Sequence, residues 1–212
     1  MPKKTDLPSL DFEFDLWQRG IMRVAGMDEA GRGALAGPVF VGAVVLPPDH
    51  PSLSRTLAGV RDSKQMTPPE RERWAAVIEA VALAWAVGQA SAVEIDALGI
   101  VPATRQAAER AIQALGPAPA YLLTDYRLEL PSVQIPQKSI LRGDCHCLSI
   151  AAASVLAKVH RDAFLRDLDG QYPGYGLARH KGYGTETHRA AIHQLGHSPV
   201  HRKTFRLKSK GS

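Results

Sequence analysis

Apolar residues in this chain fall into short runs that are separated by turns containing glycine or proline. Residues 21–25 and 37–46 are two such runs, rich in β-branched residues, with Gly31-Arg32-Gly33 between them. Continuous apolar runs of this length, bounded by turn residues, predict buried strands. We therefore expect strand, glycine-rich turn and strand, which puts Asp28 and Glu29 at the edge or end of the first strand.

After residue 66 the pattern changes to alternating helices and strands. Thr67-Pro68-Pro69-Glu70 combines a threonine cap, proline in the first turn and glutamate at the third position, and it predicts a helix to about Ala82. Further elements follow from the spacing and length of the apolar segments. They are a strand over residues 85–93, a helix over 95–115, a buried strand over 120–124 that ends at Asp125, and an alanine-rich helix over 149–168. This succession predicts one α/β domain with a mixed sheet.

The composition is typical of a soluble globular protein, with 212 residues of which 45% are hydrophobic and 22% charged. No apolar run approaches the roughly 18 residues that a membrane-spanning helix needs. The first residues, MPKKTDLPSLDFEFD, lack the apolar core of a signal peptide, so we expect a cytoplasmic protein. Cys145 and Cys147 are too close in sequence to form a stabilising disulfide framework, and they are poor evidence for zinc without a second ligand pair. Reduced thiols are expected.

Charge is distributed unevenly along the chain. The net charge is +5, and residues 179–210 are rich in Lys, Arg and His but contain a single acid, Glu186. A basic segment of this kind favours a polyanionic partner, above all a nucleic acid. A segment that only improves solubility is the alternative, and the net charge alone does not separate the two.

Acidic residues stand at the ends of three expected elements: Asp28-Glu29, Asp125, and Asp144 before the alanine-rich helix. Carboxylates beside a turn with bare backbone amides are suited to hold a cation against a phosphate. The Asp28-Glu29 motif alone supports a cation site and a solvent-exposed acidic turn equally. A dinucleotide-binding fingerprint fits poorly, because the glycines fall at 31, 33 and 37 and a strand follows. Asp144 is also explained as an acid that leads a helix, worth about 0.3 to 1 kcal/mol.

A further acid, Asp162, is expected to lie away from this group. It follows Asp144 by 18 residues, and one helix joining the two would separate them by roughly 27 Å, too far to share a metal ion. We expect Asp162 to pair with Arg161 or with another basic neighbour.

Five motifs together resemble the bacterial ribonuclease HII family, the type 2 ribonucleases H. They are DEAGRGALAGPV from Asp28, Asp62-Ser63-Lys64, the strand-end Asp125, GDCHCLSIAAASVLAKVHRD from Gly143, and HKGYGT from His180. The resemblance covers residues 21 to about 206 and implies a ribonuclease H-like fold with a small helical carboxy-terminal region. The expected division is an N-terminal extension over 1–20, a catalytic domain over 21–170 and a basic helical region over 171–212.

The resemblance also implies an activity. The enzyme would cut the RNA strand of RNA–DNA hybrids and incise 5′ to single ribonucleotides in duplex DNA, as in ribonucleotide excision repair. Asp28, Glu29, Asp125 and Asp144 match the family's four acidic positions and would bind Mg²⁺ or Mn²⁺, because crowded carboxylates need cations to stay ionised. Two ions would activate water and stabilise the leaving 3′ oxygen, which gives 5′-phosphate and 3′-hydroxyl ends.

Substrate contacts follow from the same resemblance. The backbone of Gly31, Arg32 and Gly33 would sense the 2′-hydroxyl, and Tyr183 would pack on the sugar beside the cut ribonucleotide. Contacts to phosphates are expected from Lys64, Lys181 and the basic run His201-Arg202-Lys203.

The chain departs from the family pattern in two places. Tyr126-Arg127 follows Asp125 where the family usually has glycine, and Cys145-His146-Cys147 is an unusual segment after Asp144. Both departures affect the backbone conformation that we expect near the site, but neither changes the class of reaction that the resemblance implies. Two rival functions stay open: another ribonuclease H-like nuclease of the DNA junction resolvase type, and an inactive hybrid-binding protein. A monomer is expected, and Lys208–Ser212 shows no clear pattern for binding a sliding clamp.

Overall fold

A mixed sheet forms the centre of the computed structural model, which describes residues 7–126 and 128–207. Five strands in the described ranges lie in the order β3-β2-β1-β4-β5. The central β1 pairs antiparallel with β2 and parallel with β4, while β2–β3 is antiparallel and β4–β5 parallel. The strands are β1 (Val24–Ala30), β2 (Val39–Val45), β3 (Ala84–Ala90), β4 (Tyr121–Asp125) and β5 (Gln137–Ile140). The predicted α/β class with a mixed sheet is confirmed.

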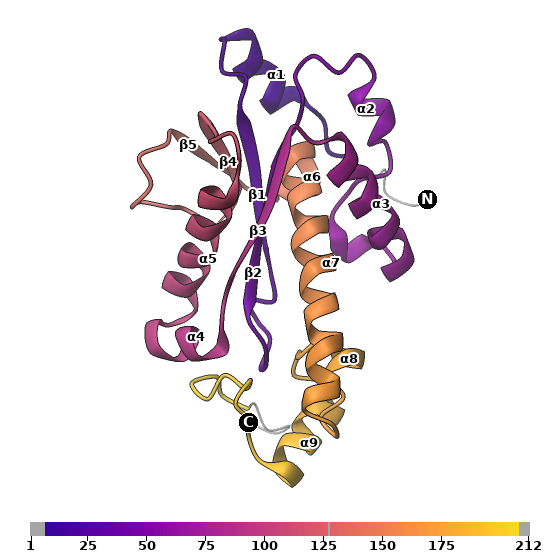
Figure 1. Ribbon diagram of the computed structural model, residues 1–212, viewed down its shortest axis with the longest axis vertical. Coiled ribbons are helices and arrows are strands. Elements are labelled where there is room, and N and C mark those ends of the chain that lie inside the picture. The colour runs from indigo at the N-terminus through magenta and orange to yellow at the C-terminus, as the bar shows by residue number, and fades with distance from the viewer. Residues whose placement is uncertain (1–6, 127, 208–212) are drawn as a thin grey trace.

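Helices cover both faces of the sheet, as Figure 1 shows for α7 (Leu148–Gln171) and α5 (Ile100–Ala114). Small residues allow α7 to lie directly on the strands. A Cβ atom added to Gly42 of β2 would lie 2.3 Å from the carbonyl oxygen of Ala153, and one added to Gly26 of β1 would lie 2.2 Å from the carbonyl carbon of Ser149. The alanine-rich segment of α7 therefore packs with backbone against backbone, as its composition indicated.

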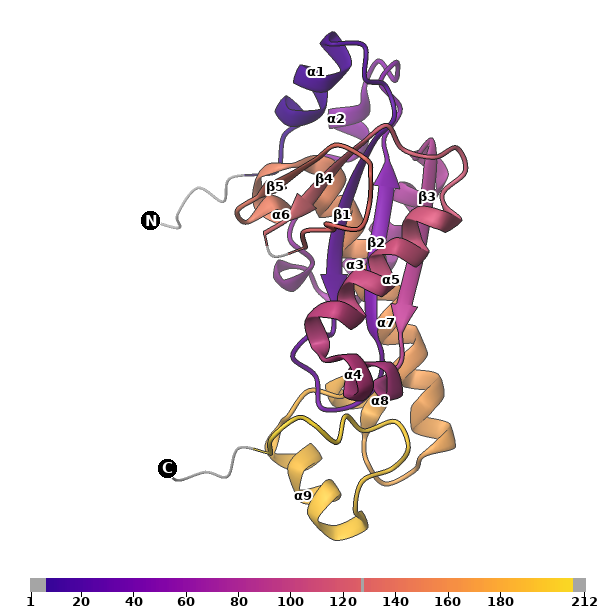
Figure 2. The ribbon, with the colours of Figure 1, turned by 90° about the vertical axis from the view of Figure 1, so that its left-hand side faces the viewer.

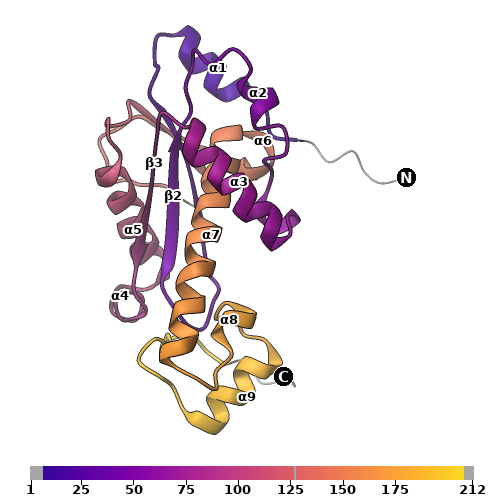
Figure 3. The same cartoon turned by 45° about the vertical axis from the view of Figure 1, so that its right-hand side comes forward.

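The predicted helix after Thr67 is confirmed as α3 (Pro68–Val81). The Thr67 hydroxyl accepts the N–H of Glu70, and the Glu70 carboxylate accepts the N–H of Thr67 at 2.7 Å. This reciprocal capping box satisfies two of the donors that a helix start leaves free. Figure 3 shows α3 beside α7 on the same side of the sheet.

Two boundaries were predicted wrongly. The strand expected to reach residue 93 ends at Ala90, because Ser91 and Glu94 form a capping box that starts α4 (Ala92–Leu98). The helix expected over 95–115 is two helices, α4 and α5, which are separated at Gly99. The φ of Gly99 is +83°, a conformation that glycine adopts readily and that ends the first helix. The edge strand β5 was not predicted, since Ile140 is its one buried residue.

Shorter elements surround the sheet. They are α1 (Asp11–Gln18), α2 (Leu53–Thr56), η1 (Ser63–Gln65) and α6 (Gly143–His146). Glu13 of α1 is fully buried and accepts hydrogen bonds from the Ser149 N–H at 2.8 Å and the Cys147 thiol at 3.1 Å, which ties α1 to the start of α7. Both cysteines are buried and free, and their reduced state stays a prediction.

The predicted small helical region near the carboxy terminus is present in the described residues up to 207. It contains α8 (Leu177–His180) and α9 (Glu186–Leu195), which lie at the far end of α7 in Figure 2. Its own apolar cluster includes Leu165 and Leu168 from α7. The expected division at residue 170 stays a prediction, and the tail Lys208–Ser212 lies outside the described residues. Over 7–126 and 128–207, no helix has the length and apolar character to cross a membrane.

Candidate active site

Two of the predicted acids lie on the central strand of the sheet. Asp28 and Glu29 are in β1, near its end, as predicted, and Asp28 is 4% exposed. The parallel register pairs Met27 with Thr124, so Asp125, the last residue of β4, follows at the position beside Asp28. Neighbouring parallel strands place their carboxyl ends at one edge of a sheet, which is where ligand sites form in α/β proteins.

Asp144 reaches the same region from α6. The sequence predicted that it would lead the alanine-rich helix, but it belongs to this separate short helix, which Cys147 divides from α7. Just before it, the backbone N–H of Gly143 donates to the Asp125 carboxylate at 2.7 Å. This hydrogen bond ties the start of α6 to the end of β4 and sets Asp144 near Asp125.

The acids converge on two adjoining cavities. The larger cavity has a volume of about 570 Å³ and is lined by Glu29, Arg32, Asp62, Lys64, Gln65, Asp125, Tyr126, Leu141, Arg142, Asp144 and Cys145. The smaller cavity has a volume of about 280 Å³ and is lined by Asp28, Glu29, Ala30, Gly31, Arg32, Gly33, Ser63, Lys64, Asp125, Lys158 and Tyr183. Because both are lined by Glu29, Arg32, Lys64 and Asp125, the two cavities form one cleft with these residues between its halves.

Burial and mutual repulsion make these carboxylates hard to ionise. Burial raises the pKa of Asp28 well above its usual range, and the charges of Glu29 and Asp125 raise it further. The pKa of Glu29 is raised by burial first and then by Asp125, against the opposing charge of Arg32. Burial also raises the pKa of Asp125, partly offset by the Gly143 N–H. A bound cation would favour the ionised forms of these carboxylates and lower their pKa values.

Lys64 supplies one positive charge within the cleft. Its Nζ lies 3.3 Å from Oδ2 of Asp144 and 3.6 Å from Oδ1 of Asp62. Burial lowers the pKa of the ammonium group, but the surrounding carboxylates, with Asp28 first among them, outweigh this and raise the pKa above its usual value. The lysine therefore stays charged and offers its ammonium group to an incoming anion.

The residues fit a hard divalent cation. Oδ2 of Asp28 and Oε2 of Glu29 are buried and accept no hydrogen bond from any described residue. Buried carboxylate oxygens without a donor are costly, and a cation with oxygen ligands satisfies them. The carboxylate set is therefore of the kind that binds a hard divalent cation.

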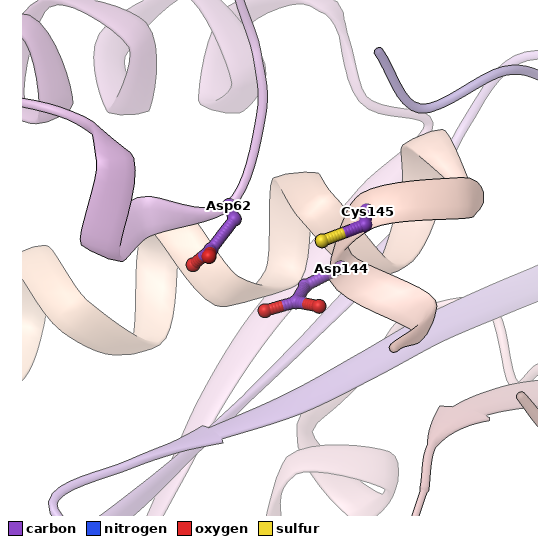
Figure 4. Close-up of side chains that lie close together, drawn as sticks. All are labelled: Asp62, Asp144 and Cys145. Carbon is purple, nitrogen blue, oxygen red and sulfur yellow. The ribbon is translucent and has the colours of Figure 1, made fainter. Parts of the chain in front are cut away.

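A second group of possible ligands lies at the edge of the cleft. Within the described ranges, the trio whose ligand atoms all lie within 4.8 Å of one another is Asp62, Asp144 and Cys145 (Figure 4). The four predicted acids are spread more widely than this trio. The Lys64 ammonium group contacts both aspartates of the trio, which already neutralises part of their charge.

The glycine turn forms one wall of the smaller cavity. Gly31 has a φ of +87°, and a Cβ atom there would collide with the side chain of Arg161. A Cβ on Gly33 would meet no atom within 4 Å, so its backbone is open to a ligand. The Arg32 guanidinium lies 3.5 Å from the Glu29 carboxylate. All three residues of the predicted turn therefore border the acidic cleft.

Tyr183 lines the smaller cavity and is 37% exposed. Two cations lie over its ring, with Nζ of Lys158 at 5.5 Å and the guanidinium carbon of Arg161 at 5.4 Å from the centroid. Lys158 was missed in the sequence, although it lies within the quoted motif and four residues before Asp162 on the same helix.

Several predicted phosphate contacts lie elsewhere. Lys181 lines neither half of the cleft, and its ammonium group donates to the carbonyl of Ala178. His201 and Arg202 are each 1% exposed, so the prediction that both are surface phosphate contacts is wrong. Lys203 is exposed, and its contact with phosphate stays a prediction. A basic run read from sequence does not reveal which side chains turn into the protein.

Asp162 lies outside the cleft, as predicted. Its carboxylate pairs with Lys158 at 2.7 Å and Arg71 at 3.5 Å. Arg161 is not its partner, because that guanidinium donates to the backbone carbonyls of Pro38, Lys181 and Ala36.

Comparisons with known proteins agree on one family. A family model described as Ribonuclease HII matches residues 25–208. A Ribonuclease HII from Synechococcus sp. is 50% identical over 198 residues, which are 93% of this chain and 88% of that protein. A Ribonuclease HII from Thermus thermophilus is 53% identical over 194 residues, or 91% of this chain and 90% of that protein.

Solved structures show the same fold. Ribonuclease H2 from Pyrococcus horikoshii has a TM-score of 0.74 and 26% identity, and the match covers 88% of this chain and 95% of that chain. Ribonuclease HII from Archaeoglobus fulgidus, solved in a complex with PCNA, has a TM-score of 0.73 and 24% identity over 89% of this chain and 98% of that chain. The predicted ribonuclease H-like fold is confirmed.

Proposed function

The chain belongs to the ribonuclease HII family and is a type 2 ribonuclease H, and we propose that Asp28, Glu29, Asp125 and Asp144 hold the metal ions with which it cuts. The substrates are the RNA strand of RNA–DNA hybrids and single ribonucleotides within duplex DNA, which it incises on the 5′ side. Products carry 5′-phosphate and 3′-hydroxyl ends.

The observation that carries this assignment is the pair of buried, partnerless oxygens on Asp28 and Glu29 beside Asp125. Burial and the neighbouring carboxylates raise their pKa values, and a bound cation would oppose that shift by favouring the ionised forms. When bound, two Mg²⁺ or Mn²⁺ ions supply Lewis acidity that activates a water for in-line attack and stabilises the leaving 3′ oxygen.

The other residues of the cleft bind and orient the strand. Lys64 and Arg32 offer positive charge to the phosphate on both sides of the acids. The open backbone at Gly33 lets a ribose approach, and the exposed face of Tyr183 suits a sugar without a 2′-hydroxyl. The ribonucleotide would lie in the smaller cavity, because the glycine turn borders that cavity.

One gel experiment tests the function. A duplex DNA with one ribonucleotide is incubated with the enzyme and Mg²⁺ or Mn²⁺, beside the matching all-DNA duplex, a long RNA–DNA hybrid and an all-DNA four-way junction. We expect cuts 5′ to the ribonucleotide and along the hybrid RNA, with the two all-DNA substrates intact.

Each alternative gives a different pattern in the same gel. Cleavage of the junction would identify a resolvase, and binding without cleavage in either metal would identify an inactive hybrid-binding protein. Asp28→Asn is the matched control for catalysis, because it preserves shape while removing the charge that holds the cation. Its residual activity should be at the background level.

A further inference from the structure

Arg202 is a buried arginine whose guanidinium donates hydrogen bonds to the glycine turn and to Gly37 in the loop that follows it. It is 1% exposed, although it lies in the basic run that the sequence assigned to phosphate contacts. Its guanidinium donates to the carbonyl oxygens of Gly31 at 2.8 Å, Arg32 at 2.9 Å and Gly37 at 2.9 Å. A side chain 170 positions away from Arg32 in sequence thereby holds three peptide groups of the loop.

The geometry of the peptide group sets what this support achieves. In a trans peptide the C=O and the following N–H point in opposite directions. Because the carbonyls of Gly31 and Arg32 face Arg202, the N–H groups of Arg32 and Gly33 face away from it. Neither N–H donates to any acceptor within the described residues. The turn therefore presents two backbone donors with no protein partner, on the wall of the smaller cavity.

Besides these hydrogen bonds, the Arg202 guanidinium lies over the ring of Phe205, with its central carbon 5.1 Å from the ring centroid. No carboxylate lies within ion-pair distance of Arg202 in the ranges 7–126 and 128–207. Burial, and then the neighbouring Arg161 guanidinium, lower the pKa of Arg202 to about 9. A desolvated charge without a counter-ion is unfavourable, whereas an apolar residue would fill the same volume without that cost.

Arg202 also joins the turn to the segment that carries Tyr183. Its backbone N–H donates to the carbonyl of Leu35 at 2.8 Å, and the N–H of Leu35 donates to the carbonyl of Gly182 at 2.8 Å. The next residue, Tyr183, borders the same cavity. The glycine turn and the segment that carries Tyr183 are thus fixed to each other through the residues around Arg202.

We propose that Arg202 is a positioning residue, which holds the Gly31-Arg32-Gly33 turn so that the N–H groups of Arg32 and Gly33 bind the 2′-oxygen of the ribonucleotide. This inference rests on the proposed function of the cleft. It assigns to the carboxy-terminal segment a part in selecting RNA rather than in binding phosphate.

The test measures preference rather than activity. Dissociation constants are compared for an all-DNA duplex and the same duplex with one ribonucleotide, with Ca²⁺ in place of Mg²⁺ and the absence of cutting checked on a gel. We take the ratio of the constant for the all-DNA duplex to the constant for the duplex with one ribonucleotide, so a higher ratio means a stronger preference for the ribonucleotide. Any difference in the fraction of folded protein cancels in this ratio. Arg202→Ala should lower this ratio about tenfold, the equivalent of about 1.4 kcal/mol, while affinity for the all-DNA duplex changes by less than about twofold.

Two further variants make the result specific. Arg202→Lys keeps the charge but not the planar fork and should give an intermediate ratio. Arg206→Ala removes an exposed arginine of the same segment and should leave the ratio unchanged. Millimolar guanidinium ion should restore part of the ratio in Arg202→Ala and have no such effect on Arg206→Ala.

The opposing results are distinct. Equal weakening of both duplexes by Arg202→Ala, or an unchanged ratio, would mean that Arg202 only supports the fold, and the inference would be wrong. If the unaltered protein itself shows no preference for the ribonucleotide, the proposed function fails instead. The two failures are separated by the unaltered protein in the same assay.

Discussion

The ammonium group of Lys64 lies 3.3 Å from the carboxylate of Asp144. It joins η1 to α6 across the mouth of the larger cavity and places a fixed positive charge where a metal ion is proposed to bind. The lysine and the metal therefore compete for the same carboxylates, although both are suited to hold a phosphate.

Lys64→Met should change metal affinity and turnover in opposite directions. Losing the ammonium group removes repulsion of the cation, worth up to about 1 kcal/mol for a partly exposed pair, so the half-saturating Mg²⁺ concentration should fall up to about fivefold. Turnover at saturating Mg²⁺ should fall, because the phosphate loses a contact. Titration of cleavage with Mg²⁺ checks both. Lys138→Met, on the edge strand β5, is the control and should alter neither.

Neutralising Asp28 should stabilise the metal-free protein. Its raised pKa shows that the folded state resists the charge, so Asp28→Asn should raise Tm in EDTA by about 2 to 4 °C for each kcal/mol of repulsion removed. The gain in Tm on adding Mg²⁺ should disappear together with cleavage. Asp15→Asn removes an exposed acid and should leave the Mg²⁺-dependent gain intact. A lower Tm for Asp28→Asn in EDTA would contradict the repulsion argument.

The same raised pKa values set the pH dependence of the metal-free protein. Folded Asp28, Glu29 and Asp125 hold protons at pH values where the unfolded chain has lost them. These groups therefore lower the free energy of unfolding as pH rises from the ordinary carboxyl range near 4 through their raised pKa values. We expect Tm in EDTA to fall less with pH in Asp28→Asn than in the unaltered protein, which thermal melts across this range will measure.

Sequence patterns located most of the fold where the signal was local. The capping box of Thr67 and Glu70 predicted the start of α3. The apolar runs over 21–25 and 37–46 predicted β1 and β2, although β1 begins at Val24 and continues to Ala30. The same box at Ser91 and Glu94 was overlooked, because the apolar residues around it extended the expected strand. Burial of Arg202 and the position of Asp144 on its own helix depend on contacts between distant segments, and no local pattern reports them.

Ser91→Ala tests the overlooked boundary. Removing the hydroxyl that accepts the N–H of Glu94 should destabilise the protein by about 1 kcal/mol, or about 2 to 4 °C in Tm. Cleavage should be unchanged below the melting range, since α4 borders neither half of the cleft. Ser52→Ala is the control, because that hydroxyl makes no capping bond at the start of α2.

Buried histidines in the carboxy-terminal region predict sensitivity to acid. Nε2 of His188 lies 3.1 Å from Nε2 of His201, a contact that needs one neutral ring as acceptor. Burial lowers the pKa of each to about 4. Since the unfolded chain binds protons first, stability is lost as pH falls from about 6.5 to about 4. Thermal melts across this range should show a decrease in Tm as the pH falls. The decrease should be smaller in His188→Gln, but it should be unchanged in His193→Gln, because His193 is an exposed residue of the same helix.

Tyr183 should matter through its ring rather than its hydroxyl. The ring lies against Lys158 and Arg161 and borders the smaller cavity. Tyr183→Phe preserves the ring and should stay within about twofold of the unaltered kcat/KM, whereas Tyr183→Ala should lose about tenfold or more on a duplex with one ribonucleotide, as expected for an aromatic ring stacked on a nucleotide. A long hybrid offers a ribose where that duplex offers a deoxyribose, so the loss there should be smaller. Equal losses on both substrates would show that the ring supports the cleft without contacting the deoxyribose. An unchanged kcat/KM in Tyr183→Ala would show that Tyr183 is not part of the site.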